Sequence, residues 1–287
     1  MKKILLLGAA GQLGTDIQKF TSASDIKIIP SERFDFDASE DSIDEKLSEY
    51  SDCDYLINCI AYHKVDACED NHEKAFNINA DFVRRLSLFT AKHTITFVHI
   101  STDYVFEGKE NKLHKEVDDC SPVNIYGMSK RNGEQLINVY GKKYFILRVS
   151  SLFGSKETDD HNINFVEKMI HAAKTGTKLK VIDNQIISPT HTKDVALAIK
   201  EIIANDFDDY GIYHCCNSGT CSWYQFAEKI LSLTGLEVDL TPVPYDSFHT
   251  HAKRPQFCAM DNSKLSKIYT MNNWEEALKE YIEIKGH

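Results

Sequence analysis

The chain is predicted to adopt an α/β fold, a doubly wound parallel sheet followed by a smaller C-terminal region. Two observations predict it. Short apolar segments alternate with longer segments of helical periodicity through the first half of the chain, as in βαβ units. A glycine-rich turn at residues 8–14 separates the first apolar segment from the first helical one.

Residues 1–150 are expected to form the first domain. Its strands are expected at the short apolar runs 3–7, 26–29, 55–60, 94–100 and 144–149. Its helices are expected at 12–21, at 73–92 and from residue 126 onward. A polar stretch, 107–121, connects the fourth strand to the third helix.

Beyond residue 150 the alternation is less regular. Residues 151–287 are expected to form mainly a second region, with the segment 178–218 returning to the first domain. Strands are expected at 180–182, 212–215 and 238–240, and helices at 165–175, 193–204, 223–234 and 274–284. The polar segment 158–164 predicts a mobile loop. Because ligands bind at the carboxyl edge of such sheets, the second region is expected to pack there.

The composition excludes several classes of function. Apolar residues make up 42% of the chain and charged residues 26%, as in ordinary globular proteins. The net charge of −10 argues against a nucleic-acid partner, because binding a phosphate backbone requires a basic surface. No apolar run reaches the ~20 residues of a membrane span. The apolar run at 4–7 is too short for a signal peptide.

The eight cysteines predict neither disulfides nor a metal site. Only Cys215, Cys216 and Cys221 lie near one another, and they lack the paired CxxC spacing of zinc ligands. Free buried thiols in a reducing cytoplasm are the expected state.

The glycine-rich turn has the composition of a nucleotide-binding loop. Gly8, Gly11 and Gly14 have the spacing GxxGxxG, and Gln12 and Leu13 open the helix. Glycine permits a tight turn and the close approach of a pyrophosphate to the amides of a helix start. The loop therefore predicts a Rossmann-like dinucleotide site, with a simple turn as the alternative.

The second strand is expected to end in the residues that bind the adenine ribose. Ser31, Glu32 and Arg33 lie together there, followed by Asp35. Arg33 would bind the 2′-phosphate of NADP, whereas Glu32 would bind the ribose hydroxyls of NAD. Both alternatives stay open, and solvated loop charges explain each residue equally well.

The end of the third strand is expected beside the same site. Ile60, Ala61 and Tyr62 would line the cofactor through their backbone, although the end of a buried strand explains them too. The next helix contains Asn77 and Asn79, where an Asn would act as a relay or as a core hydrogen-bonding group, and the structural role is favoured.

Residues 101–130 give the strongest chemical signal. Ser101 and Thr102 place hydroxyls at the end of a buried strand, while Tyr126 and Lys130 share one helix face. A phenol titrates near pH ~10 in water, and a neighbouring ammonium lowers that pKa, which makes tyrosine a usable acid or base. A hydroxyl, a tyrosine and a lysine that face one pocket suit the reduction of a carbonyl.

Other residues of similar chemistry have simpler explanations. Tyr281 and Lys285 repeat the spacing and predict an ordinary amphipathic helix. His63, His99 and His191 would suit a hydrolase, but the chain has no G-x-S-x-G elbow and no His-x-x-x-His metal pair. His99 lies inside an apolar strand and is expected to be a core residue.

Taken in order, these motifs resemble those of the extended short-chain dehydrogenases/reductases, and most closely those of the dTDP-4-dehydrorhamnose reductase family. The resemblance runs nearly from end to end. It rests on GAAGQLG at 8–14, AYHKVD at 61–66, STDYVF at 101–106, YGMSK at 126–130 with Gly133 and Glu134, SPT at 188–190, and Arg254-Pro255.

The resemblance implies a reductase of a nucleotide-linked 4-keto-6-deoxy sugar that uses NADPH or NADH. By that resemblance Tyr126 would protonate the C4 oxygen, and Thr102 would hydrogen-bond it. Lys130 would hold the nicotinamide ribose and lower the Tyr126 pKa. The enzyme would be a cytoplasmic monomer or homodimer that serves polysaccharide synthesis.

The resemblance also assigns the substrate side of the site. The residues on that side would be Tyr104, Val105, Ser151 and Arg254, with Tyr104 and Arg254 touching the sugar or its diphosphate. The chain departs from the family pattern where Ser151 replaces a frequent Trp, Ile187 a Gly and Cys258 a Ser. These departures concern which sugar fits.

Two alternatives have the same fold. An epimerase or dehydratase of nucleotide sugars is one, although a dehydratase more often has a Glu where Tyr104 follows Asp103. A non-catalytic regulatory subunit, resembling that of methionine adenosyltransferase, is the other. Such a subunit has no need of Thr102, Tyr126 and Lys130.

Overall fold

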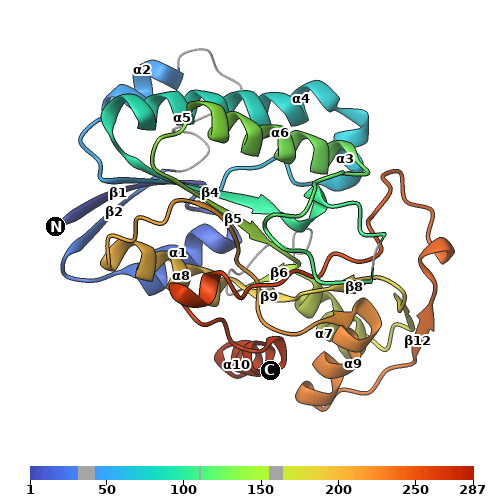
Figure 1. Cartoon of the computed structure of the whole chain (residues 1–287). Coiled ribbons are helices and arrows are strands. Elements are labelled where there is room, and N and C mark those ends of the chain that lie inside the picture. Colours follow the sequence, from blue (N-terminus) through green and yellow to red (C-terminus); the bar gives the residue numbers. More distant parts are fainter. Residues whose placement is uncertain (32–42, 110, 155–163) are drawn as a thin grey trace.

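A computed structural model of the chain describes residues 1–31, 43–109, 111–154 and 164–287 (Figure 1). Its centre is a six-stranded parallel sheet in the order β10–β5–β4–β3–β1–β2. The strand order reverses between β1 and β3, so the predicted doubly wound α/β fold is confirmed. The strands are β1 (Lys2–Leu7), β2 (Ile26–Ser31), β3 (Tyr55–Asn58), β4 (Thr96–Thr102), β5 (Tyr144–Val149) and β10 (Gly211–His214).

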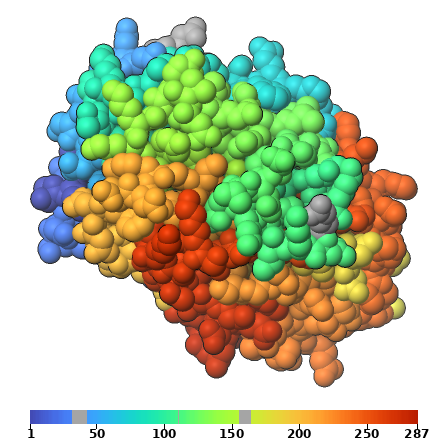
Figure 2. All heavy atoms as spheres, in the orientation of Figure 1, coloured from blue at the N-terminus to red at the C-terminus, as the bar shows by residue number. Residues whose placement is uncertain are grey.

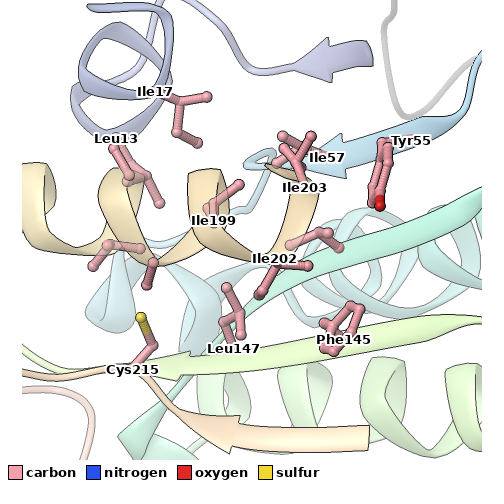
Figure 3. Packing of buried hydrophobic residues seen from close by; sticks show 14 of the residues in the cluster. Leu13, Ile17, Tyr55, Ile57, Phe145, Leu147, Ile199, Ile202, Ile203 and Cys215 are labelled. Carbon is pink, nitrogen blue, oxygen red and sulfur yellow. The ribbon is translucent and has the colours of Figure 1, made fainter. Parts of the chain in front are cut away.

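Helices cover both faces of this sheet. One layer contains α1 and α8, and the other contains α2, α5 and α6 (Figure 1). Side chains alternate along each buried strand, so Ile4 and Leu6 enter one core while Leu5 and Leu7 enter the other. Figure 3 shows the first core, in which Ile199 of α8 packs over the sheet. The helices are α1 (Gln12–Thr21), α2 (Ile43–Ser48), α5 (Phe82–His93), α6 (Ile125–Tyr140) and α8 (Thr192–Ala204).

The predicted helix 73–92 is divided into three parts. It consists of α4 (His72–Phe76), a π-helical turn η1 (Asn77–Asp81) and α5. Gly133 of α6 lies against this turn, where a Cβ would come within 2.3 Å of the Asn79 carbonyl oxygen. Only glycine allows the two helices to approach this closely.

Two predicted strands are displaced along the chain. β4 begins at Thr96 rather than at residue 94, because Thr94 adopts a left-handed φ of 62° that ends α5. β12 (Leu240–Val243) lies beyond the predicted 238–240 and pairs with β7 (Leu179–Ile182). The short helices α2 and α3 (Val65–Asp70) were not predicted, since six residues give too little periodicity.

The C-terminal elements build a third core around Phe226 and Trp274. Tyr281 is buried in this core on α10, which confirms the ordinary amphipathic helix predicted there. Figure 2 shows the C-terminal residues, orange to red, against the green connection between β4 and α6. The remaining elements are α7 (Phe165–Lys174), α9 (Trp223–Thr234), α10 (Trp274–Lys285), β6 (Leu152–Phe153), β8 (Ile186–Ile187), β9 (Thr190–His191), β11 (Cys221–Ser222), and the 3₁₀ turns η2 (Asp103–Val105), η3 (Tyr245–Ser247) and η4 (Leu265–Lys267).

Four predictions fall partly or wholly outside the described residues. They concern Glu32, Arg33 and Asp35, which were expected at the adenine ribose, and most of the predicted loop 158–164. Within the described part of the chain, no helix combines the length and the apolar character needed to cross a membrane.

Candidate active site

The glycine-rich turn joins β1 to α1 and leaves little room for a side chain at Gly8 and none at Gly14. Gly8 has a φ of +76°, and a Cβ there would meet the Cys59 carbonyl carbon at 3.1 Å. A Cβ on Gly14 would lie 2.3 Å from the Gly8 oxygen. Gly11 is the N-cap of α1, and no side chain caps the first amides of this helix. This cradle fits a pyrophosphate at the positive end of the helix.

The two residues that open α1 have different surroundings. Leu13 is buried in the first core, so only its backbone can face a ligand. The side chain of Gln12 is half-buried, and its Oε1 accepts a hydrogen bond from Asn164 Nδ2 at 3.3 Å.

The segment after β3 is fixed beside this cradle by two asparagines. Asn58 Oδ1 accepts from the Ile60 amide at 3.0 Å. Asn79 binds both polar groups of the Tyr62 backbone, at 2.9 and 3.0 Å, and donates to Ser129 Oγ. The structural role expected for an asparagine of this helix is therefore confirmed at Asn79, and Ala61 lies within the segment that Asn79 holds.

The predicted Thr102–Tyr126 pair meets at the carboxyl edge of the sheet. The hydroxyl of Tyr126 lies beside Thr102, and the rings of Tyr104 and Tyr126 lie 5.8 Å apart, edge to face. Asn124 caps α6 by accepting from the Gly127 amide at 2.8 Å, which places Tyr126 in the first turn. Gly127 is required, because a Cβ there would lie 2.1 Å from the Tyr104 oxygen.

The ammonium expected beside Tyr126 points elsewhere. Lys130 is buried, and its Nζ donates to the Ile100 carbonyl at 2.7 Å and lies 3.1 Å from His99 Nε2. Burial lowers the pKa of Lys130 to about 8. Burial also raises the pKa of Tyr126, against the effect of the Thr102 hydrogen bond. In this arrangement the expected lowering of the Tyr126 pKa by Lys130 does not occur.

Asp103 is a buried carboxyl group that sequence reasoning missed. Thr102 Oγ1 donates to its Oδ1 at 2.9 Å, and Ser150 Oγ donates to its Oδ2 at 2.7 Å. Burial raises the pKa of Asp103 to about 6, although these hydrogen bonds oppose the rise. Its only sequence signal was its place after the strand-end hydroxyl.

The four residues predicted on the substrate side are not equivalent. Tyr104 faces Tyr126, and Ser151 adopts a left-handed φ of 44° just after β5. Arg254 Nη2 donates to Asp66 Oδ2 at 2.6 Å. The side chain of Val105 is fully buried, so any substrate contact at Val105 would involve its backbone.

Two departures from the family pattern lie inside the protein. Ile187 is buried in the third core, which argues against a place in the pocket wall. Cys258 is buried beside Asp103 and Tyr104, so a change there acts on the site directly. All eight cysteines are free, and the described residues contain no group of three or more His, Cys, Asp or Glu side chains placed to hold a metal ion.

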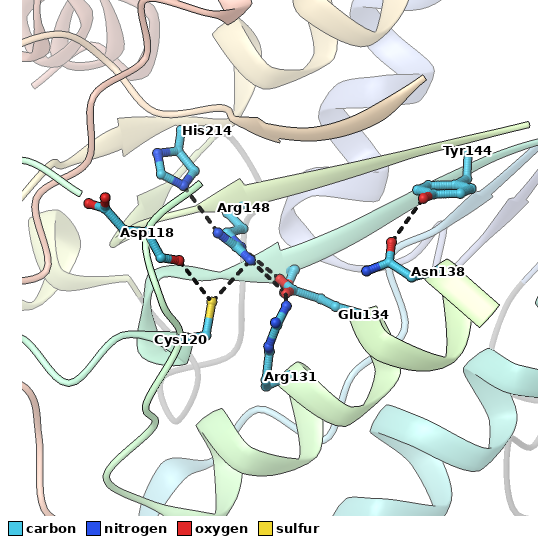
Figure 4. Close-up of polar contacts among 9 residues, drawn as sticks. Asp118, Cys120, Arg131, Glu134, Asn138, Tyr144, Arg148 and His214 are labelled. Atoms are coloured by element: carbon cyan, nitrogen blue, oxygen red, sulfur yellow. Dashed lines mark hydrogen bonds and ion pairs between the residues drawn. The ribbon is translucent and has the colours of Figure 1, made fainter. Parts of the chain in front are cut away.

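A network of polar contacts around Glu134 lies behind the site (Figure 4). The carboxylate of Glu134, one turn after Lys130, accepts from Ser101 Oγ at 2.7 Å and from Arg131 and Arg148. Because Ser101 precedes Thr102, this network links α6, β4 and β5 directly behind the reactive hydroxyls.

Comparison with known proteins gives one consistent family. The family model described as "RmlD substrate binding domain" matches residues 1–286. The spore coat polysaccharide biosynthesis protein SpsK of Bacillus subtilis is 35% identical, covering 99% of this chain and 98% of SpsK. A crystal structure of a dTDP-4-dehydrorhamnose reductase from Clostridium acetobutylicum is 36% identical, with a TM-score of 0.92 and coverage of 99% and 100%. The enzyme of that name from Bacillus anthracis, solved with NADP, is 34% identical, with the same TM-score and coverage.

Proposed function

The chain belongs to the family of the RmlD substrate binding domain, as its motifs predicted, and we propose that it reduces dTDP-4-dehydrorhamnose to dTDP-rhamnose with NADPH or NADH. The single observation that carries the proposal is the placement of the Tyr126 hydroxyl beside Thr102. It lies at the carboxyl edge of a parallel sheet, the edge at which such folds bind ligands.

The reduction adds a hydride to C4 of the sugar and a proton to its oxygen. The bound nicotinamide supplies the hydride. Tyr126 delivers the proton to the oxygen, and Thr102 holds that oxygen by a hydrogen bond once its hydroxyl turns away from Asp103. The glycine cradle at Gly8, Gly11 and Gly14 supports a pyrophosphate, and Lys130 is the group proposed to hold the ribose.

The substrate is proposed to bind between the sheet edge and the C-terminal region. Arg254 suits a diphosphate, because a guanidinium presents several N–H donors in a fixed plane. Tyr104 and Ser151 would face the sugar, and Val105 would contribute its backbone. In this proposal residues 1–150, with segments of 178–218, bind the cofactor, and the rest of 151–287 binds mainly the substrate.

A cytoplasmic location is proposed as well. The eight free thiols support it, because disulfides are rare in a reducing compartment. Whether the enzyme is a monomer or a homodimer is tested by sedimentation of the full chain at several concentrations.

The proposal is tested by following the oxidation of NADPH and of NADH with dTDP-4-dehydro-6-deoxy sugars made in place by the upstream enzymes. Oxidation coupled to formation of dTDP-rhamnose is expected. Conversion of the sugar without net oxidation would favour an epimerase. No oxidation with any of these sugars, together with copurification of a synthetase, would favour a regulatory subunit.

A further inference from the structure

A row of buried polar groups crosses β3, β4 and α6 behind the site. The Ile60 amide donates to Asn58 Oδ1 at 3.0 Å, and Asn58 Nδ2 lies 3.2 Å from His99 Nδ1. On the other side of the ring, His99 Nε2 lies 3.1 Å from Lys130 Nζ, which donates to the Ile100 oxygen at 2.7 Å. The sheet register pairs Asn58 with His99, and the side chains of Asn58, His99 and Lys130 are inaccessible to solvent.

The direction of each hydrogen bond in this row follows from its first member. A backbone amide can only donate, so Asn58 must present its oxygen to Ile60 and its NH₂ group to His99. An NH₂ group has no acceptor, so Nδ1 of His99 must accept. A neutral imidazole that accepts at Nδ1 carries its proton on Nε2.

The proton on Nε2 of His99 then determines whether Lys130 is charged or neutral. An N–H at Nε2 faces the lysine nitrogen, and an ammonium has no lone pair with which to accept it. A neutral amine can accept from His99 and still donate to the Ile100 carbonyl. A charged His99 would instead turn an Nδ1 proton toward the Asn58 NH₂ group.

Burial outweighs the charges that would favour an ammonium at Lys130. Glu134 acts on it from one turn along α6, but this carboxylate is already bound by two arginines and Ser101. Cys59 of the neighbouring segment is a neutral thiol, because burial raises its pKa to about 12. Burial lowers the pKa of both His99 and Lys130. A buried cation without an anionic partner is unstable relative to its neutral form.

We propose that His99 is a positioning residue that holds Lys130 as a neutral amine in the cofactor-free enzyme at mildly alkaline pH, and that Lys130 takes up a proton there when the nucleotide binds. The second half rests on the proposed function, in which Lys130 meets the ribose hydroxyls and supplies a positive charge near Tyr126. The first half rests only on the contacts of the row.

The first test is NMR of the full, cofactor-free chain at pH 9. The ¹⁵N shifts of His99, assigned with His99→Gln, should show a bare Nδ1 and a protonated Nε2. The ¹³Cε shift of Lys130, assigned with Lys130→Arg, should titrate near pH ~8, far below an ordinary lysine. The opposite tautomer, or a lysine charged above pH 10, would overturn the proposal.

The second test uses the near-isosteric variant Asn58→Asp to reverse the direction of the hydrogen bonds that His99 makes. The carboxylate would still accept from Ile60 but would accept from His99 as well, which moves the imidazole proton to Nδ1. Nε2 then accepts from Lys130, and the proton affinity of Lys130 should rise about tenfold or more. Asn138→Asp, which adds the same charge at an exposed position of α6, should leave it unchanged. If Lys130 titrates at the same pH in both variants and in the parent, the inference is contradicted.

The third test measures proton uptake by calorimetry of NADPH binding at pH 9, in two buffers of different ionisation enthalpy. Uptake is expected in the parent, and it should be strongly reduced in Asn58→Asp. If Asn58→Asp fails to fold, His99→Gln replaces it, and its Lys130 titration must then differ from the parent. None of these measurements requires turnover, so an inactive enzyme would defeat the proposed function and leave this inference testable.

Discussion

The guanidinium of Arg148 and the carboxylate of Glu134 form a buried two-point ion pair, with Nε to Oε1 and Nη2 to Oε2 both at 2.8 Å. It connects the end of β5 to the middle of α6 (Figure 4). The ring of Phe106 lies under the same guanidinium, with its centroid 5.1 Å away. The pair therefore fixes the helix that carries Tyr126 against the strand that precedes Ser150.

Removing one member of this pair is expected to destabilise the protein strongly. Glu134→Ala leaves Arg148 buried without its counter-ion, so the free energy of unfolding should fall by about 3–5 kcal/mol. Urea denaturation measures this. Replacing both residues, as Glu134→Leu with Arg148→Met, should recover much of the loss. A double variant that is less stable than Glu134→Ala would refute this account.

Asp103 is expected to make stability depend on pH. Its pKa of about 6 in the folded protein is raised from an ordinary 3.8, so the folded state retains a proton that the unfolded state releases. The free energy of unfolding is therefore highest below pH ~4 with respect to this group and falls by on the order of 3 kcal/mol as the pH rises through 6. Urea denaturation at several pH values should show a flatter profile for Asp103→Asn. The exposed control Asp246→Asn should keep the parent profile.

Gly14→Ala is expected to impair the cofactor cradle. The added Cβ would meet the Gly8 oxygen, so the turn must shift away from the start of α1. The Kd for NADPH should rise about tenfold, which corresponds to ~1.4 kcal/mol. Fluorescence titration measures it, with Lys19→Ala as the control on an exposed position of α1. Unchanged affinity would show that the turn does not contact the cofactor.

Tyr126→Phe is expected to separate chemistry from binding. Without its proton donor, kcat should fall by about 10²–10⁴-fold, while the Kd for NADPH stays close to that of the parent. Stopped-flow reduction and fluorescence titration test the two halves. Tyr140→Phe makes the same change at the far end of α6 and should retain full activity. Ordinary turnover by Tyr126→Phe would assign the proton to another group.

Arg254 and Asp66 are expected to act together on the substrate. Arg254→Gln removes a charged donor, so KM for the nucleotide sugar should rise by roughly tenfold to a hundredfold with little change in kcat. Asp66→Asn should raise KM less, because it loosens the guanidinium without removing it. The surface control Arg84→Gln should leave KM unchanged. Additive effects in the double variant would show that the two residues act independently.

Local patterns in the sequence were sufficient for much of the fold and part of the site. The limits of α1, β5 and α9 follow from periodicity alone. The glycine spacing gives the cradle, because steric exclusion of a Cβ is a property of a few consecutive residues. The division of the helix at Asn77–Asp81 was beyond such reasoning, since it depends on the close passage of Gly133.

By itself, then, the sequence determined the class of sheet, the family, and the identities of Thr102, Tyr126 and Lys130. Only the tertiary structure decided what surrounds them. Ser150 reaches Asp103 across 47 positions, His99 reaches Lys130 across 31, and Arg254 reaches Asp66 across 188. Charge state and donor direction depend on burial and on such distant partners, and no local pattern encodes either.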